Sequence, residues 1–214
     1  LCRVLGVVEM ASADFEADDL IGSMASVVRG NNVQPVIVSR DKDLMQLIEG
    51  QDLYWDFGKS NAKGQSELES ELDLGCRQMA DYLALVGDAS DNIQGVPGIG
   101  SKTAKQLLSH FSDVEAIMGH LDQLQDLPIR GAKKLADKLA GCADQLRLAR
   151  QLTTIRCDVK SMPNLQGIEW KGIHLDAFEL FCEEMGFGSA FSRRTVDLKL
   201  RDTHPYRPTS PLPK

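Results

Sequence analysis

Residues 79–108 read MADYLALVGDASDNIQGVPGIGSKTAKQLL, and the architecture of the chain changes within this stretch. From Cys76 to Val86 the apolar residues follow a helical spacing. Beyond Gly87 the apolar runs typical of β-strands almost vanish, and glycines separate segments with helical spacing. The second half is therefore predicted to be helical, with helices over residues 102–110, 114–118, 133–140, 143–155 and 175–185.

The first half alternates short apolar runs with helical patterns. Runs at residues 7–10, 35–38 and 53–57 predict strands, and an apolar stripe over 17–29 predicts a helix between the first two. Strand, helix and strand at this spacing favour parallel pairing. A short helix over 41–48 and a polar connection over 58–71 complete an α/β pattern.

Composition limits the kind of protein. Of the 214 residues, 43% are hydrophobic and 26% are charged, which is typical of a globular protein with its own core. The five cysteines are scattered without a C-x-x-C pair, which argues against a disulfide framework or a zinc knuckle. We therefore expect a reducing, cytoplasmic compartment. No apolar run approaches the length that spans a bilayer, so we expect no membrane partner.

Charge is distributed unevenly along the chain. The net charge is −7, but residues 1–94 carry −10, residues 95–160 carry +3 and residues 161–214 are neutral. This division suggests that the first part gathers cations and the helical part meets an anionic partner. Unevenly solvated surfaces are the alternative explanation.

Three acidic groups stand out: Glu16-Ala-Asp18-Asp19, Asp41-Lys-Asp43 and Asp88-Ala-Ser-Asp91. The first two follow predicted strands, where open α/β sheets place their sites. Each group taken alone could simply begin a helix, because acidic side chains accept hydrogen bonds from the unpaired amides there. Seven carboxylates at one site would instead require cations. Oxygen ligands without histidine or thiolate select Mg²⁺ or Mn²⁺, and the four histidines lack zinc-ligand spacing.

A glycine-rich loop precedes the helix predicted at 102–110. It is not a phosphate loop of an NTPase, because Ser101 occupies the position that requires lysine, and Thr103 breaks the dinucleotide fingerprint. We therefore expect no nucleotide cofactor. The remaining interpretation is a turn that approaches a DNA phosphate and then begins a helix, with a plain interhelical turn as the alternative. The candidate DNA-binding residues are Gly95, Gly98, Gly100, Ser101, Lys102 and Lys105.

Three strings together resemble the 5′→3′ exonuclease/flap endonuclease family, which includes the 5′-nuclease domain of bacterial DNA polymerase I. They are FEADDLIGSMA at 15–25, VIVSRDKDLMQLI at 36–48 and the stretch at 79–108, and the resemblance runs from about residue 7 to 188. It implies a PIN-like parallel-sheet core, a helix-three-turn-helix DNA-binding segment and a two-metal site that cuts 5′ flaps or 5′ ends. It leaves open a K⁺ ion on carbonyl groups of the loop at 95–100.

The resemblance also assigns roles to the acidic residues. It implies that Glu16, Asp18 and Asp19 belong mainly to a first metal site, and that Asp41 and Asp43 with Asp88 and Asp91 build a second. Catalytic roles would fall on Glu16, Asp18, Asp19, Asp41 and Asp43. Members of the family begin with an Asp-bearing strand and a basic arch that are not found ahead of Glu16 here. We therefore expect an N-terminally truncated chain that lacks part of its active site.

These patterns predict four regions. Residues 1–87 would be the nuclease core, 88–160 the helix-three-turn-helix region, 161–200 a helical region packed on the core, and 201–214 a disordered proline-rich tail. We expect a monomer that binds two Mg²⁺ or Mn²⁺ ions and acts on DNA with 5′ flaps, ends or nicks. The alternative is a non-catalytic DNA-structure-binding module with the same fold. A PIN-like ribonuclease is disfavoured because the helical clamp suits duplex DNA.

Overall fold

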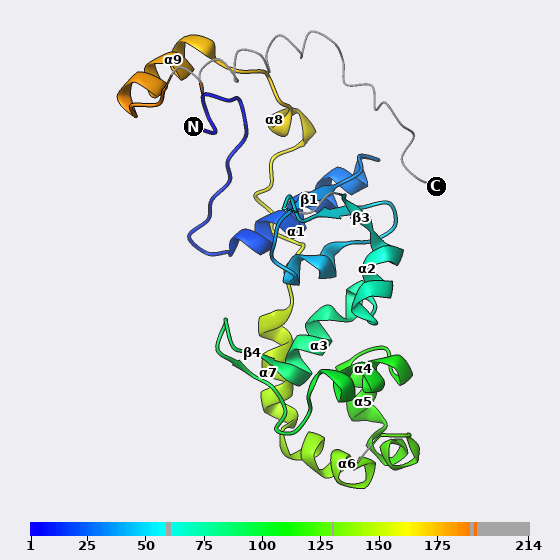
Figure 1. The fold of residues 1–214 in the computed structure, drawn as a ribbon. Coiled ribbons are helices and arrows are strands. Elements are labelled where there is room, and N and C mark those ends of the chain that lie inside the picture. Colours follow the sequence, from blue (N-terminus) through cyan, green and yellow to red (C-terminus); the bar gives the residue numbers. More distant parts are fainter. Residues whose placement is uncertain (59–60, 130, 189–190, 192–214) are drawn as a thin grey trace. The chain divides into compact units, whose positions relative to one another are not determined.

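The computed structural model describes residues 1–58, 61–129, 131–188 and 191 (Figure 1). It divides into two compact units: one comprises Ala13–Met162, and the other comprises Leu1–Ser12 together with the chain from Pro163 onward. The tail predicted at 201–214 lies outside the described residues, as do residues 192–200 of the predicted C-terminal region. Within the described ranges, no helix has both the length and the apolarity that crossing a membrane requires.

The larger unit begins with helix α1 and a small sheet. Helix α1 (Ala17–Gly30) leads to β1 (Val36–Val38), which pairs in parallel with β2 (Leu53–Trp55). The register sets Ile37 opposite Tyr54, and both side chains are buried. Strand β3 (Lys63–Gly64) pairs antiparallel with β2, so the order is β1-β2-β3. The parallel pairing predicted from the sequence is present, but between the second and third predicted strands.

Two expectations for the first half are wrong. Residues 7–10 form no strand, because no ladder partner pairs with them in the described part of the chain, and Val7, Val8 and Met10 are exposed. The stretch 58–71 is not merely a polar connection, since β3 and helix α2 (Gln65–Leu72) lie in it. Only one side chain of α2, Leu68, is fully buried, so its apolar stripe is too short to be evident in the sequence.

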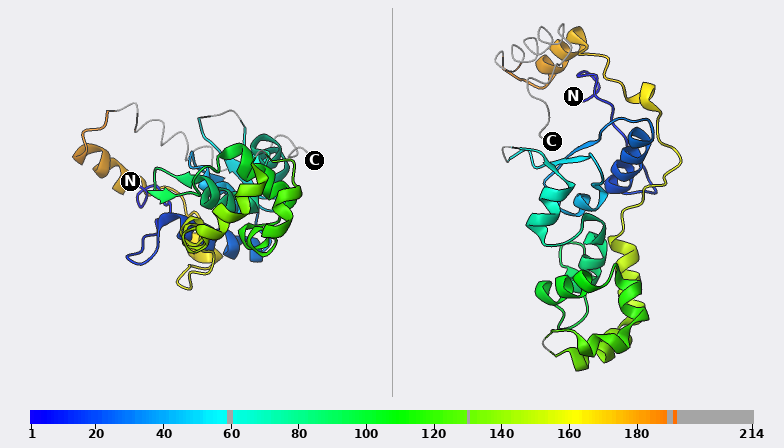
Figure 2. Two further views of the ribbon diagram at one scale, coloured as in Figure 1. Left: turned by 90° about the horizontal axis from the view of Figure 1, so that it is seen from below. Right: turned by 90° about the vertical axis from the view of Figure 1, so that its right-hand side faces the viewer.

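The predicted helical half is present. After the 3₁₀ turns η1 (Asp43–Leu47) and η2 (Cys76–Gln78), helix α3 (Met79–Val86) runs into a hairpin of β4 (Gly87–Asp88) and β5 (Ile93–Gln94). Then follow α4 (Ser101–His110), α5 (Val114–Gly119), η3 (Leu121–Asp126), α6 (Ala132–Gly141) and α7 (Ala143–Thr153). In Figure 1 and the right-hand view of Figure 2, α4 to α6 lie at the opposite end of this unit from the sheet.

A buried ion pair fixes how these helices meet. The carboxylate of Asp81 on α3 is 2.6 Å from Nε of Arg150 on α7, and it also accepts the backbone N–H of Val114 at 3.0 Å. Thr153 at the end of α7 donates its hydroxyl to the carbonyl of Ala80 at 2.8 Å. Because Asp81 is 2% exposed, its negative charge is compensated by these partners and not by solvent. Helices α3 and α7 therefore form the frame from which the β4–β5 hairpin projects.

The smaller unit has its own apolar cluster. Helices α8 (Leu165–Ile168) and α9 (Leu175–Glu184) belong to it, and Phe178 of α9 is fully buried. The N-terminal segment packs here through Val4 and Leu5, and the indole N–H of Trp170 donates to the carbonyl of Leu5 at 2.8 Å. The first residues of the chain are therefore held by side chains more than 160 residues away in sequence.

Candidate metal centre

Three carboxylates from two distant segments meet in the larger unit. Asp43 lies in the first turn of η1, Asp88 ends strand β4, and Asp91 lies in the turn of the β4–β5 hairpin. One carboxylate oxygen of each lies within 4.8 Å of the other two. Asp43 and Asp88 are partly buried and Asp91 is exposed, so the cluster opens to solvent on one side.

The segment after β1 is shaped by hydrogen bonds to short polar side chains. The hydroxyl of Ser39 accepts the N–H of Asp41 at 3.0 Å, and the carboxylate of Asp41 accepts the N–H of Asp43 at 3.0 Å. The phenol of Tyr54 on β2 donates to the carbonyl of Asp41 at 2.9 Å. These bonds replace a regular helical start and hold Asp43 in place beside the sheet.

The hairpin that carries Asp88 and Asp91 is closed in a similar way. The carboxylate of Asp88 accepts the backbone N–H of Ser90 at 2.8 Å and also the Ser90 hydroxyl. The hydrogen bond from the Ser90 hydroxyl contributes most to a lowered pKa of Asp88, and the backbone bond acts in the same direction, because both favour the charged carboxylate. Asn92 has a φ of +56°, a conformation that asparagine tolerates better than most residues. Asp88 is thus an anion held in a fixed orientation.

The start of α1 brings further negative charge to the same place. Burial raises the pKa of Asp18, and the charges of Asp41, Glu16, Asp19 and Asp91 raise it further. Because charges in a protein influence one another strongly only at short range, Asp18 lies near Asp41 and Asp91 as well as near its own helix start. The residues predicted for the two metal sites therefore share one region of the larger unit.

Asp19 is engaged differently from its neighbours. One of its oxygens accepts the backbone N–H of Arg156 at 2.8 Å, and the other accepts that of Glu16 at 3.4 Å in a capping arrangement. Both oxygens therefore already have a protein partner. Asp19 holds the start of α1 against the segment that follows α7, whereas its predicted part in metal binding stays a prediction.

The strongest electrostatic effect falls on Asp43. Burial raises its pKa to about 6, and the charges of Asp41, Asp88, Asp91 and Asp18 act in the same direction. A carboxyl group so perturbed carries an unfavourable charge once it is ionised, and a bound cation would offset the charges of its neighbours. All donors in this cluster are carboxylate oxygens, with no histidine or cysteine among the described residues of the group. Such donors fit hard divalent cations such as Mg²⁺ or Mn²⁺.

The glycine-rich loop is a turn followed directly by a helix. The N–H of Ile99 donates to the carbonyl of Val96 at 3.0 Å, and Gly98 between them has a φ of +80°, as the third residue of a type II turn requires. Helix α4 then begins at Ser101 after Gly100, whose lack of a side chain leaves the first amides of the helix without a side-chain cap. Lys102 is exposed on the first turn.

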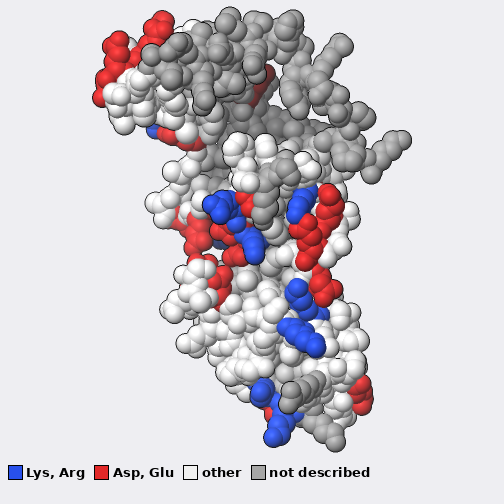
Figure 3. All heavy atoms as spheres, viewed as in Figure 1, with Lys and Arg blue, Asp and Glu red and all other residues white. Residues whose placement is uncertain are grey.

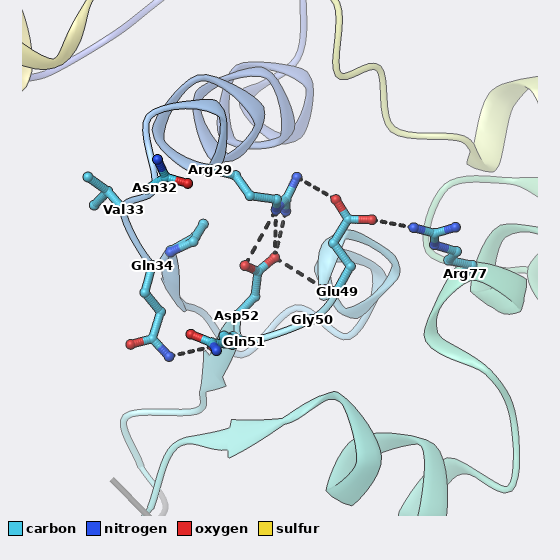
Figure 4. A pocket seen from close by; sticks show the side chains of 10 residues that line it. Arg29, Asn32, Val33, Gln34, Glu49, Gly50, Gln51, Asp52 and Arg77 are labelled. Carbon is cyan, nitrogen blue, oxygen red and sulfur yellow. Dashed lines mark hydrogen bonds and ion pairs between the residues drawn. The ribbon is translucent and has the colours of Figure 1, made fainter. Parts of the chain in front are cut away.

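A second group of charged residues lines a cavity elsewhere, at the start of the strands. About 510 Å³ in volume, it is lined by Arg29, Glu49, Asp52 and Arg77 among others (Figure 4). The guanidinium of Arg29 is 2.6 Å from the buried carboxylate of Asp52 and 2.8 Å from Glu49, which also pairs with Arg77. These charges neutralise one another, so the cavity is part of the fold and not an extension of the carboxylate cluster.

Sequence reasoning missed the residues that orient the clustered carboxylates. Ser39, Tyr54 and Ser90 form hydrogen bonds with Asp41 and Asp88 and are not acidic themselves. The pattern Asp-x-Ser at 88–90 is a local signal for a side-chain turn and could have been used. Nothing in the sequence pairs Tyr54 with Asp41, because that contact crosses two neighbouring strands.

Two family models match the chain. Residues 1–72 match the N-terminal resolvase-like domain of 5′-3′ exonuclease, and residues 74–176 match its C-terminal SAM fold. The chain belongs to the 5′-3′ exonuclease family. The resemblance carried by the three sequence strings is thereby confirmed.

Several curated members of the 5′-3′ exonuclease family are similar to this chain. A 5′-3′ exonuclease of Buchnera aphidicola subsp. Schizaphis graminum is 37% identical over 155 residues, or 72% of this chain and 54% of that protein. DNA polymerase I of Pseudomonas aeruginosa is 37% identical over 159 residues, or 74% of this chain and 17% of the polymerase. Flap endonuclease Xni of Vibrio parahaemolyticus is 33% identical over 167 residues, or 78% of this chain and 61% of that protein. The chain thus spans about half the length of the Buchnera exonuclease.

Solved structures share the fold. T5 5′-exonuclease with bound divalent zinc ions has a TM-score of 0.57 and 23% identity, over 67% of this chain and 51% of that one. The catalytic core of Rad2 in complex with a DNA substrate has a TM-score of 0.58 and 17% identity, over 93% of this chain and 66% of that one. The predicted fold class, an α/β core followed by a helical region in the manner of 5′ nucleases, is confirmed.

Proposed function

We propose that this chain provides the metal centre and a DNA-binding loop of a divalent-metal-dependent 5′ nuclease. The reaction would be hydrolysis of DNA phosphodiester bonds at 5′ flaps, ends or nicks, in DNA replication and repair. The observation that carries the proposal is the meeting of Asp43, Asp88 and Asp91 within 4.8 Å, although some 45 residues separate the first from the other two. Membership of the 5′-3′ exonuclease family supports it.

Each group of residues has a distinct task in this proposal. Asp43, Asp88 and Asp91, with Asp41 beside them, would hold one ion, and Glu16 with Asp18 would contribute to a second. Divalent ions bound there would lower the pKa of a water molecule and offset the charge that builds up on the scissile phosphate. The protein's own part is to orient the carboxylates through Ser39, Tyr54 and Ser90 and to hold the duplex through the loop at 95–100.

The alternative, a DNA-binding module without catalysis, accounts less well for the charges. Carboxylates gathered beside a DNA site repel phosphates unless cations neutralise them. Burial of Asp43 makes its ionised form costlier still, as its raised pKa of about 6 indicates. A binding module would gain nothing from this arrangement.

Metal binding tests the assignment directly. Calorimetric titration of the chain with Mn²⁺ should show binding that Asp43→Asn and Asp91→Asn each weaken at least tenfold, because each variant removes a charged ligand from the cluster. Asp137→Asn, an exposed acid on α6, is the matched control and should bind like the wild type. Unchanged affinity in both cluster variants would overturn the second-site assignment.

Cleavage tests the activity itself. A labelled duplex with a 5′ flap and a blunt duplex of the same sequence would be incubated in Mg²⁺ and in EDTA. We expect slow Mg²⁺-dependent cuts near the flap junction, because the Asp-bearing strand and the basic arch implied by the family resemblance are not among these residues. Asp88→Asn should make no cuts but should still bind the duplex. Duplex binding without any Mg²⁺-dependent cleavage would favour the binding module instead.

The proposal also covers the oligomeric state, the bound ions and the location of the protein in the cell. We expect a monomer, two Mg²⁺ or Mn²⁺ ions, no nucleotide cofactor and a place on the nucleoid. A K⁺ ion on carbonyl groups of the loop at 95–100 would tighten duplex binding in KCl relative to NaCl at equal ionic strength. Equal affinities in the two salts would argue against that ion.

A further inference from the structure

A lysine that is not among the predicted DNA-binding residues reaches the glycine-rich loop. The ammonium nitrogen of Lys138 on α6 lies 2.7 Å from the position that a Cβ would take on Gly98. Gly98 therefore serves the loop twice, by its φ of +80° and by leaving room for the ammonium group. Lys138 itself is exposed, and no carboxylate of the described residues pairs with it.

The position of Lys138 is set by well-packed neighbours. Leu135 and Leu139 on the same helix are 5% and 0% exposed, so the backbone that carries the lysine is anchored in the core. The loop is anchored as well, because the side-chain amide of Gln145 donates to the carbonyls of Gln94 at 3.1 Å and Gly95 at 3.2 Å. The helix that carries Lys138 and the loop beside it are therefore both anchored, which keeps the ammonium group within reach of the loop.

Lys105, by contrast, is already occupied. Its ammonium group donates to the carbonyl of Leu72, at the last residue of α2, and its side chain is partly buried. A lysine at the C-terminal end of a helix satisfies a carbonyl that lacks a partner and interacts favourably with the helix dipole. This contact gives Lys105 a structural task, whereas Lys102 and Lys138 are exposed lysines near the loop in the described part of the chain.

We infer that Lys138 is a DNA-backbone contact that acts with Lys102 at the loop formed by residues 95–100, whereas Lys105 supports the fold. The inference rests on the proposed function and adds to it a contact from α6. An ammonium group binds a phosphate as a point charge and carries no base information, so the contact is independent of sequence. Figure 3 agrees, since Lys and Arg side chains lie along the lower half of the face in view, over the helical part of the larger unit.

Salt dependence of duplex binding tests the inference. Fluorescence anisotropy with a nicked duplex would compare the wild type with Lys138→Gln over a range of salt concentrations. Loss of one phosphate contact should reduce the slope of log K against log salt by about 0.9, which corresponds to roughly eightfold weaker binding at about 0.1 M salt. Lys138→Arg should keep the wild-type slope, because it keeps the charge.

Two matched variants separate this contact from general charge and from folding. Lys134→Gln removes an exposed lysine one turn earlier on α6. It should change the slope of log K against log salt by less than half as much as Lys138→Gln does. Lys105→Met should lower the urea midpoint of unfolding, whereas the salt dependence of its duplex binding should match that of the wild type. Lys138→Gln should unfold like the wild type, since its ammonium group fills no part of the core.

The outcomes distinguish this inference from the proposed function. Wild-type slope and affinity in Lys138→Gln would overturn the contact while leaving duplex binding intact. Equal losses in Lys134→Gln and Lys138→Gln would also overturn it, because they would indicate a diffuse field of charge. Failure of the wild-type chain to bind any duplex would instead overturn the proposed function, and this contact with it.

Discussion

Replacing Asp43 with asparagine should stabilise the metal-free protein at neutral pH. The folded chain raises the pKa of Asp43 from 3.8 to about 6, through burial first and then through the charges of Asp41, Asp88, Asp91 and Asp18. No hydrogen bond of the Asp43 carboxylate would be lost, because the contact that holds this residue in place is made by its backbone N–H. The substitution therefore removes mainly an unfavourable charge.

The size of the effect follows from the shift. A rise of about 2 pKa units corresponds to about 3 kcal/mol at full strength, and solvent screening of this half-buried group reduces it to about 1–2 kcal/mol. Between the unfolded pKa of 3.8 and the folded value of about 6, the folded state binds more protons than the unfolded state. The free energy of unfolding of the wild type should therefore fall as pH rises through this window, and the full penalty is present above it.

Urea unfolding at about pH 5, 6 and 7.5 in EDTA would measure this. We expect the free energy of unfolding of Asp43→Asn to exceed that of the wild type by about 1–2 kcal/mol at the highest pH and by much less at about pH 5. Asp137→Asn, on the exposed side of α6, should match the wild type throughout. With saturating Mg²⁺ this difference should shrink or reverse, because the wild type gains more binding free energy from the ion than the variant does.

Two results would refute this reasoning. If Asp43→Asn were less stable than the wild type in EDTA at neutral pH, the carboxylate would be making a favourable contact that the structure does not show. If the difference were the same at every pH, the perturbed ionisation would not be its cause.

Three further substitutions probe the elements that carry the site, each measured by urea unfolding and Mn²⁺ titration. Asp81→Ala leaves the arginine of α7 without its partner and should cost about 2–3 kcal/mol, with little change in metal affinity per folded molecule. Tyr54→Phe removes the hydrogen bond to the carbonyl of Asp41; it should cost about 1 kcal/mol and also weaken Mn²⁺ binding. Gly95→Ala would place a Cβ 2.3 Å from a backbone carbon of α3 and should unfold the hairpin region, whereas Gly100→Ala meets nothing within 4 Å and should be tolerated.

Local patterns in the sequence were sufficient to predict most of the helices. The apolar stripe at 17–29 became α1, and the segments predicted at 102–110 and 133–140 became α4 and α6 with ends shifted by one residue. Helical spacing depends only on residues close together in the chain, so it can be recognised from the sequence alone. The strand predicted at 7–10 fails for the opposite reason, because a strand exists only where another strand pairs with it.

The sequence by itself also determined which residues could form a metal site, since the three acidic groups offer only hard oxygen donors. Only the tertiary structure decided which of them meet. It places Asp43 beside Asp88 and Asp91, engages both oxygens of Asp19 in backbone contacts, ties Lys105 to the end of α2 and brings Lys138 to the glycine-rich loop. The reason is physical: the type of ligand is set by the chemistry of one side chain, whereas its partners depend on how α3 and α7 pack. Packing of helices joins residues that are remote in the chain, and no local pattern records it.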